Sequence, residues 1–112
     1  MARNDPRAAG IKTVATPNRV TTHPGKALAE AFLLPLGLSV NALAMALRRP
    51  TTRMGAVVKG ARAVTADTAL RLARFFGTSP EFWVNLQAMH DLTKARQEGG
   101  TMIVRDIQPH AA

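Results

Sequence analysis

Residues 41–60, NALAMALRRPTTRMGAVVKG, decide the fold. Leu43 and Leu47 are four residues apart, which is helical spacing, and a proline soon afterwards stops this helix. Beyond the proline, Met54 and Val57 begin a second apolar face at the same spacing. Positive charge gathers at the break between the two. The stretch is either a DNA-reading helix-turn-helix or a pair of packed helices with a solvated basic edge.

Helix start and stop signals continue on both sides of this stretch. Ser39 is a good N-cap because its hydroxyl can accept from an otherwise unpaired backbone N–H. Gly60 stands where a glycine commonly ends a helix. Thr65 caps a further predicted helix that Gly77 closes, and Ser79, followed by proline and glutamate, starts the next one. The pattern predicts short helices joined by short connections.

The first predicted helix lies within residues 23–37, HPGKALAEAFLLPLG. Leu28 and Phe32 share one face of it at i, i+4 spacing. We expect this helix to end at Pro35 and Gly37, because proline lacks a backbone N–H and glycine readily leaves the helical conformation.

The last predicted helix begins with TSPEFWVNLQAMHDL. Phe82, Leu86 and Met89 fall at i, i+4 and i+7 with Trp83 beside them, so we expect these side chains to fill the core. The glycine pair at 99–100 is expected to end the helix.

Three segments follow from this reading. Residues 1–22 carry basic side chains among Pro, Thr, Asn and Gly, and we expect a disordered basic arm. Residues 23–98 form the domain, and residues 99–112 form a short tail in which 103–107 is either an edge strand or disordered. The predicted fold is all-α: one compact domain of five helices.

The net charge of +8 indicates an anionic partner, namely nucleic acid, an acidic protein surface or anionic lipid. The distribution of charge favours the central segment as the contact surface. Between Glu30 and Asp67 the chain has no acidic residue, although five basic residues stand there: Arg48, Arg49, Arg53, Lys59 and Arg62.

The sequence offers little for catalysis. There is no cysteine, and the three histidines are too far apart for metal-ligand spacing. No paired carboxylates and no phosphate-binding glycine loop stand out, so we expect neither an enzyme nor a cofactor. With no signal sequence and no long apolar run, we expect a soluble cytoplasmic protein that does not bind membranes.

In a helix-turn-helix the second helix enters the major groove and its N-terminal residues reach base edges. Here these residues are Thr51, Thr52 and Arg53, and arginine is suited to bidentate contact with guanine. Lys59 and Arg62 are placed for phosphates. The complete predicted DNA-binding set is Ser39, Arg49, Thr51, Thr52, Arg53, Gly55, Lys59 and Arg62.

The segment LSVNALAMALRRP…MGAVVKG resembles the Xre-type (lambda-repressor-like) helix-turn-helix. More specifically, HPGKALAEAFLLPLGLSVNALAMAL and VTADTALRLARFFGTSPEFWVNLQAMHDL are similar to the HigA, or VapI-like, antitoxins. The similarity runs from His23 to about Ala95. It implies a homodimer that binds operator DNA, represses its own operon and neutralises a HigB toxin, which is a RelE-like mRNA-cleaving protein.

Three positions depart from the family pattern. Val40 replaces a frequent glutamine, and Gly55 replaces a frequent Asn or Ser, which removes a base contact. Arg48 replaces the glycine of the turn. If Arg48 adopts a positive φ as that glycine does, the strain is about 1 kcal/mol or more.

Two other functions fit the same residues. A stand-alone Xre-type transcription regulator would lack a toxin partner. A protein-interaction module with degenerate DNA binding would bind DNA weakly, with steep salt dependence and without sequence preference.

Overall fold

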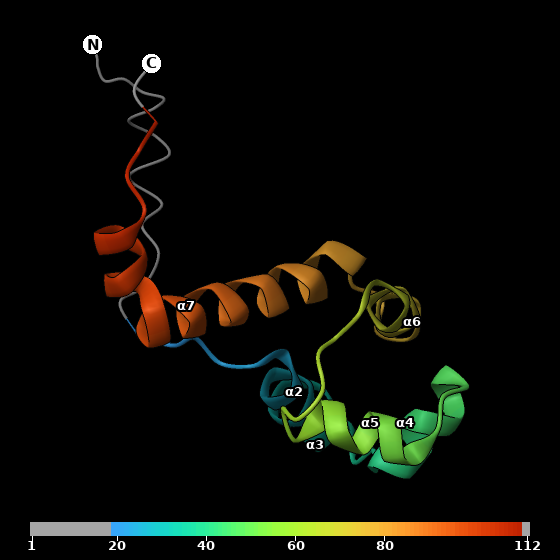
Figure 1. Cartoon of the computed structure of the whole chain (residues 1–112). Coiled ribbons are helices and arrows are strands. Elements are labelled where there is room, and N and C mark those ends of the chain that lie inside the picture. Colours follow the sequence, from blue (N-terminus) through green and yellow to red (C-terminus); the bar gives the residue numbers. More distant parts are fainter. Residues whose placement is uncertain (1–18, 111–112) are drawn as a thin grey trace.

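The computed structural model describes residues 19–110, and within this range it is helical without strands. The elements are α2 (Pro24–Ala27), η1 (Leu28–Leu33), α3 (Leu34–Leu36), α4 (Val40–Leu47), α5 (Thr51–Val58), α6 (Ala66–Phe76) and α7 (Pro80–Asp106). Because α2, η1 and α3 are continuous, the described part contains five helical rods (Figure 1). The all-α, five-helix prediction is confirmed. Most of the predicted basic arm lies outside the described residues.

The first rod runs from Pro24 to Leu36 and includes a π-helical stretch at η1. Its end differs slightly from the expected one, since Pro35 lies inside α3 and Gly37 provides the stop with φ 62°. The wider π-helical turns precede Pro35, whose ring would clash with the carbonyl four residues earlier in a regular α-helix.

The predicted N-caps of the next helices are present. The Ser39 hydroxyl accepts from the Ala42 N–H at 3.0 Å, and the Ser79 hydroxyl accepts from the Phe82 N–H at 3.1 Å. Thr65 caps α6 in the same way by accepting from the Thr68 N–H. These short side chains fix where α4, α6 and α7 begin, and therefore the register of each buried face.

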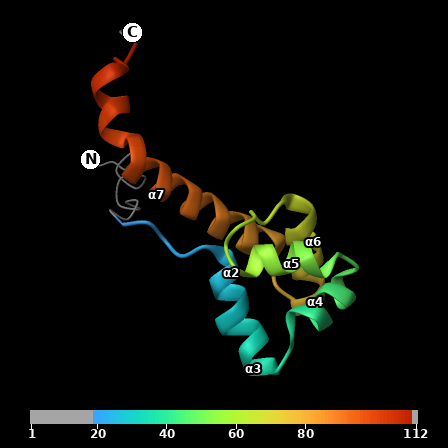
Figure 2. The ribbon, with the colours of Figure 1, turned by 60° about the horizontal axis from the view of Figure 1, so that its bottom comes forward.

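The core lies where the first rod, α4, α5 and α6 meet the first half of α7 (Figure 2). Its fully buried side chains include Leu28, Leu43, Met54, Leu72 and Trp83. Each such side chain contributes about 1.5–3 kcal/mol by leaving water, so burial on this scale holds the short helices together.

The buried face of α7 differs from the predicted one. Trp83 is buried and Leu86 packs against the core, as predicted, but Phe82 and Met89 are 40% and 37% exposed, and Gln87 and Thr93 are buried instead. The reason is polar: the Gln87 side chain accepts from the Val64 N–H at 2.8 Å, and the Thr93 hydroxyl accepts from the Thr21 N–H at 2.9 Å. Helix α7 therefore turns towards the core a face that satisfies backbone groups of other segments.

The prediction that a glycine pair ends the last helix was wrong. Helix α7 continues through Gly99 and Gly100 to Asp106, so the segment predicted as an edge strand or disordered is helical over 103–106. Glycine weakens a helix by only about 1 kcal/mol and does not forbid it. The last turns, red in Figure 1, leave the axis of the earlier ones, and glycine pairs are a known cause of such bends.

A close backbone approach ties the first rod to α5. A Cβ atom added to Gly25 would stand 2.0 Å from the Val57 carbonyl oxygen and 2.8 Å from that of Val58. Only glycine fits there, and the contact holds the end of α5 against the start of α2.

No single helix in residues 19–110 is long and apolar enough to cross a membrane. The pair Pro24–Leu36 and Val40–Leu47 passes the same test of length and composition together, with a bend of 99° between them. Its large apolar side chains Leu28, Leu33 and Leu43 lie in the core.

Candidate DNA interface

Helices α4 and α5 and the residues between them form a helix-turn-helix. The turn begins with Arg48 at φ 60° and ψ 44°, a left-handed conformation that a helix end commonly takes with glycine. Here the Arg48 N–H donates to the Met45 carbonyl and the Arg49 N–H donates to the Ala44 carbonyl at 3.0 Å. Arg48 thus does adopt a positive φ, the condition under which strain is expected at this residue, and these two bonds hold it there.

The first turn of α5 presents the side chains predicted to read bases. Thr51 and Thr52 are exposed and Arg53 is half-exposed, while Met54 and Val57 hold the opposite face of α5 in the core. The buried face of α5 therefore fixes the helix to the core, and its opposite face is accessible to a ligand.

The sequence did not single out Asn41, which belongs to the same surface. The Thr51 hydroxyl donates to the Asn41 side-chain oxygen at 2.9 Å, which links the first turn of α5 to the start of α4. The side-chain amide nitrogen of Asn41 lies 4.0 Å from the Met45 sulfur, which is long for a hydrogen bond. Facing positions across the two helices, which only the fold reveals, bring Asn41 and Thr51 together.

Gly55 has a different environment from Thr51 and Thr52. It is half-buried, and an added Cβ would approach only a Val40 methyl group, at 4.0 Å. The missing side chain thus points towards α4. With only this one atom within 4 Å, the position has room for an alanine side chain.

Two predicted phosphate ligands stand beyond the end of α5. Lys59 and Arg62 are both exposed. Between them, Gly60 has φ 79°, and the Ala61 N–H donates to the Ala56 carbonyl at 2.9 Å, so the chain turns sharply after α5. Ser39, at the far side of the motif, is occupied by capping α4.

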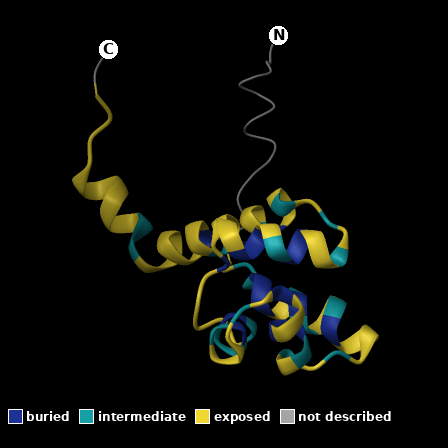
Figure 3. Ribbon diagram, turned by 90° about the vertical axis from the view of Figure 1, so that its right-hand side faces the viewer, coloured by how far each residue is buried: buried dark blue, intermediate teal, exposed yellow. Residues whose placement is uncertain are grey.

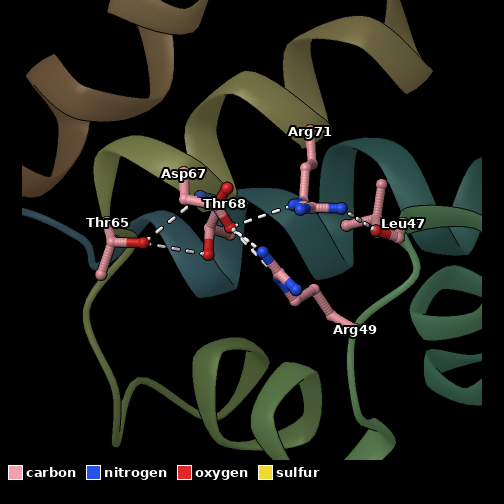
Figure 4. A network of polar contacts seen from close by, with 6 residues as sticks. All are labelled: Leu47, Arg49, Thr65, Asp67, Thr68 and Arg71. Atoms are coloured by element: carbon pink, nitrogen blue, oxygen red, sulfur yellow. Dashed lines mark hydrogen bonds and ion pairs between the residues drawn. The ribbon is translucent and has the colours of Figure 1, made fainter.

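Arg49 is held by a carboxylate rather than left free (Figure 4). Its guanidinium lies 2.6 Å from the Asp67 carboxylate, which also accepts from Arg71 at 3.0 Å. Arg71 in turn donates to the Leu47 carbonyl at 2.9 Å, at the end of α4. Asp67 thus ties the turn of the motif to α6.

The two arginines lower the pKa of Asp67, first through their hydrogen bonds and then through their charge. The carboxylate is half-exposed, so water screens much of this interaction. The i, i+4 spacing of Asp67 and Arg71 was visible in the sequence, but the contact with Arg49 joins residues 18 apart and needs the fold.

The predicted basic residues do not converge on one compact binding site. Lys59 and Arg62 follow α5, Arg53 opens it, and Arg49 faces α6. Among the described residues no group of three or more His, Cys, Asp or Glu side chains is arranged to hold a metal ion. An exposed helix start flanked by separated cations suits a long anion with regularly spaced charges, as a nucleic-acid backbone is.

The fold and this surface define a helix-turn-helix protein of the DNA-binding class. No protein-family model matches the chain. The chain is 47% identical over 76 residues to virulence-associated protein I of Dichelobacter nodosus, covering 68% of this chain and 70% of that protein. The chain belongs to the HigA-like (VapI-like) family of Xre-type helix-turn-helix proteins.

Two solved structures are similar over most of the chain. An addiction module antidote protein of a HigA family from Coxiella burnetii has a TM-score of 0.77 and 48% identity, covering 82% of this chain and 99% of that one. The Pseudomonas aeruginosa antitoxin HigA, solved with the higBA promoter, has a TM-score of 0.78 and 38% identity, covering 80% and 98%.

Proposed function

We propose that the chain is a DNA-binding antitoxin that represses its own operon and neutralises a HigB-like toxin. The observation that supports DNA binding is the exposed first turn of α5 with Thr51, Thr52 and Arg53, backed by a buried face. The relative from Pseudomonas aeruginosa was solved with promoter DNA, and it shares the fold. No reaction is catalysed, because covering a promoter and occluding a toxin are both binding events.

In the proposed complex α5 enters the major groove. Arg53 reads a base edge, Thr51 and Thr52 meet bases or phosphates, and Lys59 and Arg62 bind phosphates. Asn41 joins them through its bond to Thr51. The ion pair of Arg49 with Asp67 holds the turn of the motif against α6, so Arg49 has a smaller part in direct DNA contact than the sequence predicts.

A homodimer fits this mode of reading. Two copies related by a two-fold axis would place two α5 helices in successive major grooves, about 34 Å apart. The expected operator is therefore a palindrome with half-sites one helical turn apart.

The direct test is a fluorescence-anisotropy titration with the promoter DNA upstream of the gene and a scrambled duplex, at two salt concentrations. We expect a preference of about a hundredfold or more that survives the higher salt, since specific DNA-binding proteins typically prefer their sites by about a thousandfold or more. Equal binding to both duplexes, lost at the higher salt, would instead indicate the degenerate interaction module.

Two variants separate reading from positioning. Arg53→Ala is expected to weaken operator binding by about 1–3 kcal/mol and to relax base preference. Lys59→Ala is expected to weaken binding to all sequences alike and to flatten the salt dependence. An unchanged base preference in Arg53→Ala would show that α5 is not the reading helix.

The antitoxin role needs its own assay. A neighbouring gene for a small basic RelE-like protein is expected, and its product should block cell-free translation. Adding this chain at an equal concentration should restore translation, whereas the isolated toxin should stay active without it. If the chain does not restore translation but binds its promoter specifically, it acts as a stand-alone transcription regulator.

A further inference from the structure

A pocket of about 540 Å³ lies between the end of α4 and one face of α6. Its lining includes Arg48, Asp67, Leu70, Arg71, Arg74 and Phe75. The α6 residues 67, 70, 71 and 74 fall at i, i+3, i+4 and i+7, so they share one face of the helix. Exposed residues alternate with buried ones along α6, and this face is turned away from the core (Figure 3). None of the lining residues belongs to the DNA-binding set predicted from the sequence.

Two large apolar side chains of this pocket are uncovered. Leu70 is 59% exposed and Phe75 is 44% exposed. The rings of Phe75 and Phe76 meet edge to face with 4.9 Å between their centroids, and Phe76 packs against the core. A neighbour on the core side therefore fixes the position of Phe75. Exposed apolar side chains that stand beside polar ones are typical of protein-contact surfaces.

The pocket carries an excess of positive charge. Three arginines line it together with one carboxylate, and that carboxylate, Asp67, already accepts from Arg71 and from Arg49. The guanidiniums of Arg48 and Arg74 have no hydrogen bond or ion pair with any residue in the range 19–110. An acidic ligand would neutralise this excess charge.

One wall of the pocket is already ordered. Leu47, Asp67 and Arg71 belong both to the pocket lining and to the network of Figure 4. Arg71 donates to the Asp67 carboxylate at 3.0 Å and to the Leu47 carbonyl at 2.9 Å, which joins α6 to α4. A ligand would not need to order these side chains, and this lowers the entropy cost of binding.

The backbone of Arg48 points to a functional role for its side chain. Its φ of 60° lies in the left-handed region, where glycine would be without strain. Residues other than glycine that are held in this conformation are concentrated at binding sites, where the function of the side chain offsets the strain. Because no described residue pairs with the Arg48 guanidinium, it is available to a ligand of the pocket.

We propose that this pocket docks an acidic segment of a partner protein, in which large apolar side chains stand between carboxylates. Arg48 and Arg74 bind the carboxylates, for which the guanidinium has matching geometry. Leu70 and Phe75 pack against the apolar side chains of the segment. Arginine and aromatic residues are enriched in protein interfaces whereas lysine is depleted, and among the described lining residues there are three arginines, one phenylalanine and no lysine.

The proposal does not rest on the proposed antitoxin function. The expected toxin is basic and would meet like charge at this pocket, so the partner is a further protein. Nucleic acid fits the pocket less well than an acidic segment does. Phosphates would pair with the arginines but would leave Leu70 and Phe75 without an apolar group to cover them.

The first test is a fluorescence-anisotropy titration of the full chain with the labelled peptide Asp-Glu-Leu-Phe-Asp-Asp-Leu, without DNA. We expect a dissociation constant of roughly 10–100 μM, as for a small transient contact. Asn-Gln-Leu-Phe-Asn-Asn-Leu lacks the charges and Asp-Glu-Ser-Ser-Asp-Asp-Ser lacks the apolar side chains, so each should bind about tenfold more weakly or worse. No binding of the first peptide, or equal binding of either control peptide, would overturn the proposal.

The second test places the peptide on the pocket. Arg74→Glu and Leu70→Ser should each raise the dissociation constant of the first peptide about tenfold or more. Arg19→Glu and Leu34→Ser make the same changes at exposed residues outside the pocket lining and should bind like the wild type. Circular dichroism should show that all four variants are folded. Equal effects of a variant and its matched control would place the peptide elsewhere and reject this site.

The third test separates the acidic segment from DNA. The peptide titration is repeated with saturating duplex DNA, and the peptide affinity should stay within about threefold of its value without DNA. The Leu70→Ser variant should keep the promoter affinity of the wild type. Displacement of the peptide by DNA would assign the arginines to phosphates and overturn the proposal. Because the peptide titrations need no DNA, their failure is distinct from a failure of the proposed promoter binding.

Discussion

Replacing Arg48 with glycine should make the protein more stable, although it removes a large side chain from the turn of the DNA-binding motif. Arg48 is the only described residue other than glycine with a positive φ, at 60°. Gly37 and Gly77 follow their helices with similar φ values of 62° and 76°. Gly60, just after α5, has φ 79°, so glycine takes the positive φ at three of the four such helix ends among the described residues, and arginine carries the strain at the fourth.

The magnitude follows from two opposing effects. The left-handed conformation costs an L-residue about 1–2 kcal/mol. Glycine removes this cost but loses about 0.5–1 kcal/mol through the greater freedom of its unfolded chain. Arg48→Gly should thus gain about 0.5–1 kcal/mol, or a few degrees in Tm. The side chain itself is exposed and lies outside the hydrogen bonds and ion pairs described for residues 19–110, so its loss costs little.

The matched control is Arg48→Ala, which removes the same charge and keeps the strain. Urea unfolding can be followed by the fluorescence of Trp83, the single tryptophan, which is fully buried. We expect Arg48→Ala within about 0.5 kcal/mol of the wild type and Arg48→Gly above both. Equal stability of the two variants would refute the idea that the backbone of Arg48 is strained. Promoter titrations should show the same loss for both, since both remove one cation.

Three further outcomes are expected from the same unfolding and binding assays. Gly25→Ala should lower the free energy of unfolding by more than about 2 kcal/mol, because the added Cβ would overlap the Val57 carbonyl. Gly55→Ala is the matched control, because the Cβ has room there and should stabilise the helix. Equal effects of the two variants would contradict the close backbone approach at Gly25. Burial, and then the nearby His90, lower the pKa of His23, so its contribution to stability is present above the ordinary histidine pKa and is lost as the pH falls through the lower folded value. A His23→Asn variant, which keeps an acceptor for the Gly25 N–H, should lose that part of the pH dependence; an unchanged profile would assign it to other groups. Asp67→Asn should weaken the hold on Arg49 and raise the affinity for all DNA, with a steeper salt dependence; weaker binding instead would show that Asp67 is needed to position the motif.

Most helix starts and stops, though not the end of α7, were predictable because they depend on local chemistry. Ser39, Thr65 and Ser79 cap helices through bonds to residues three positions away, and Gly37, Gly60 and Gly77 take positive φ values at the ends. The family's glycine at the position of Arg48 raised a positive φ as a condition, and the structure meets it. Interactions between residues only three or four positions apart can be predicted from the local sequence.

The buried face of α7 was not predictable in the same way. Apolar spacing favoured Phe82 and Met89, but the fold buries Gln87 and Thr93 because the backbone N–H groups of Val64 and Thr21 need acceptors there. Those N–H groups belong to segments 23 and 72 residues away. Periodicity records hydrophobic contact and carries no information about such distant polar partners.

For the candidate site, the sequence by itself determined the two helices, the turn and the excess of positive charge around them. Only the tertiary structure decided which of these charges is free. Arg49 and Arg53 are equivalent in the sequence as cations near the turn, but Asp67, on another helix, holds Arg49 and leaves the first turn of α5 to Arg53. The physical reason is that a side chain's partners depend on distances across helices, which helical periodicity along one segment does not specify.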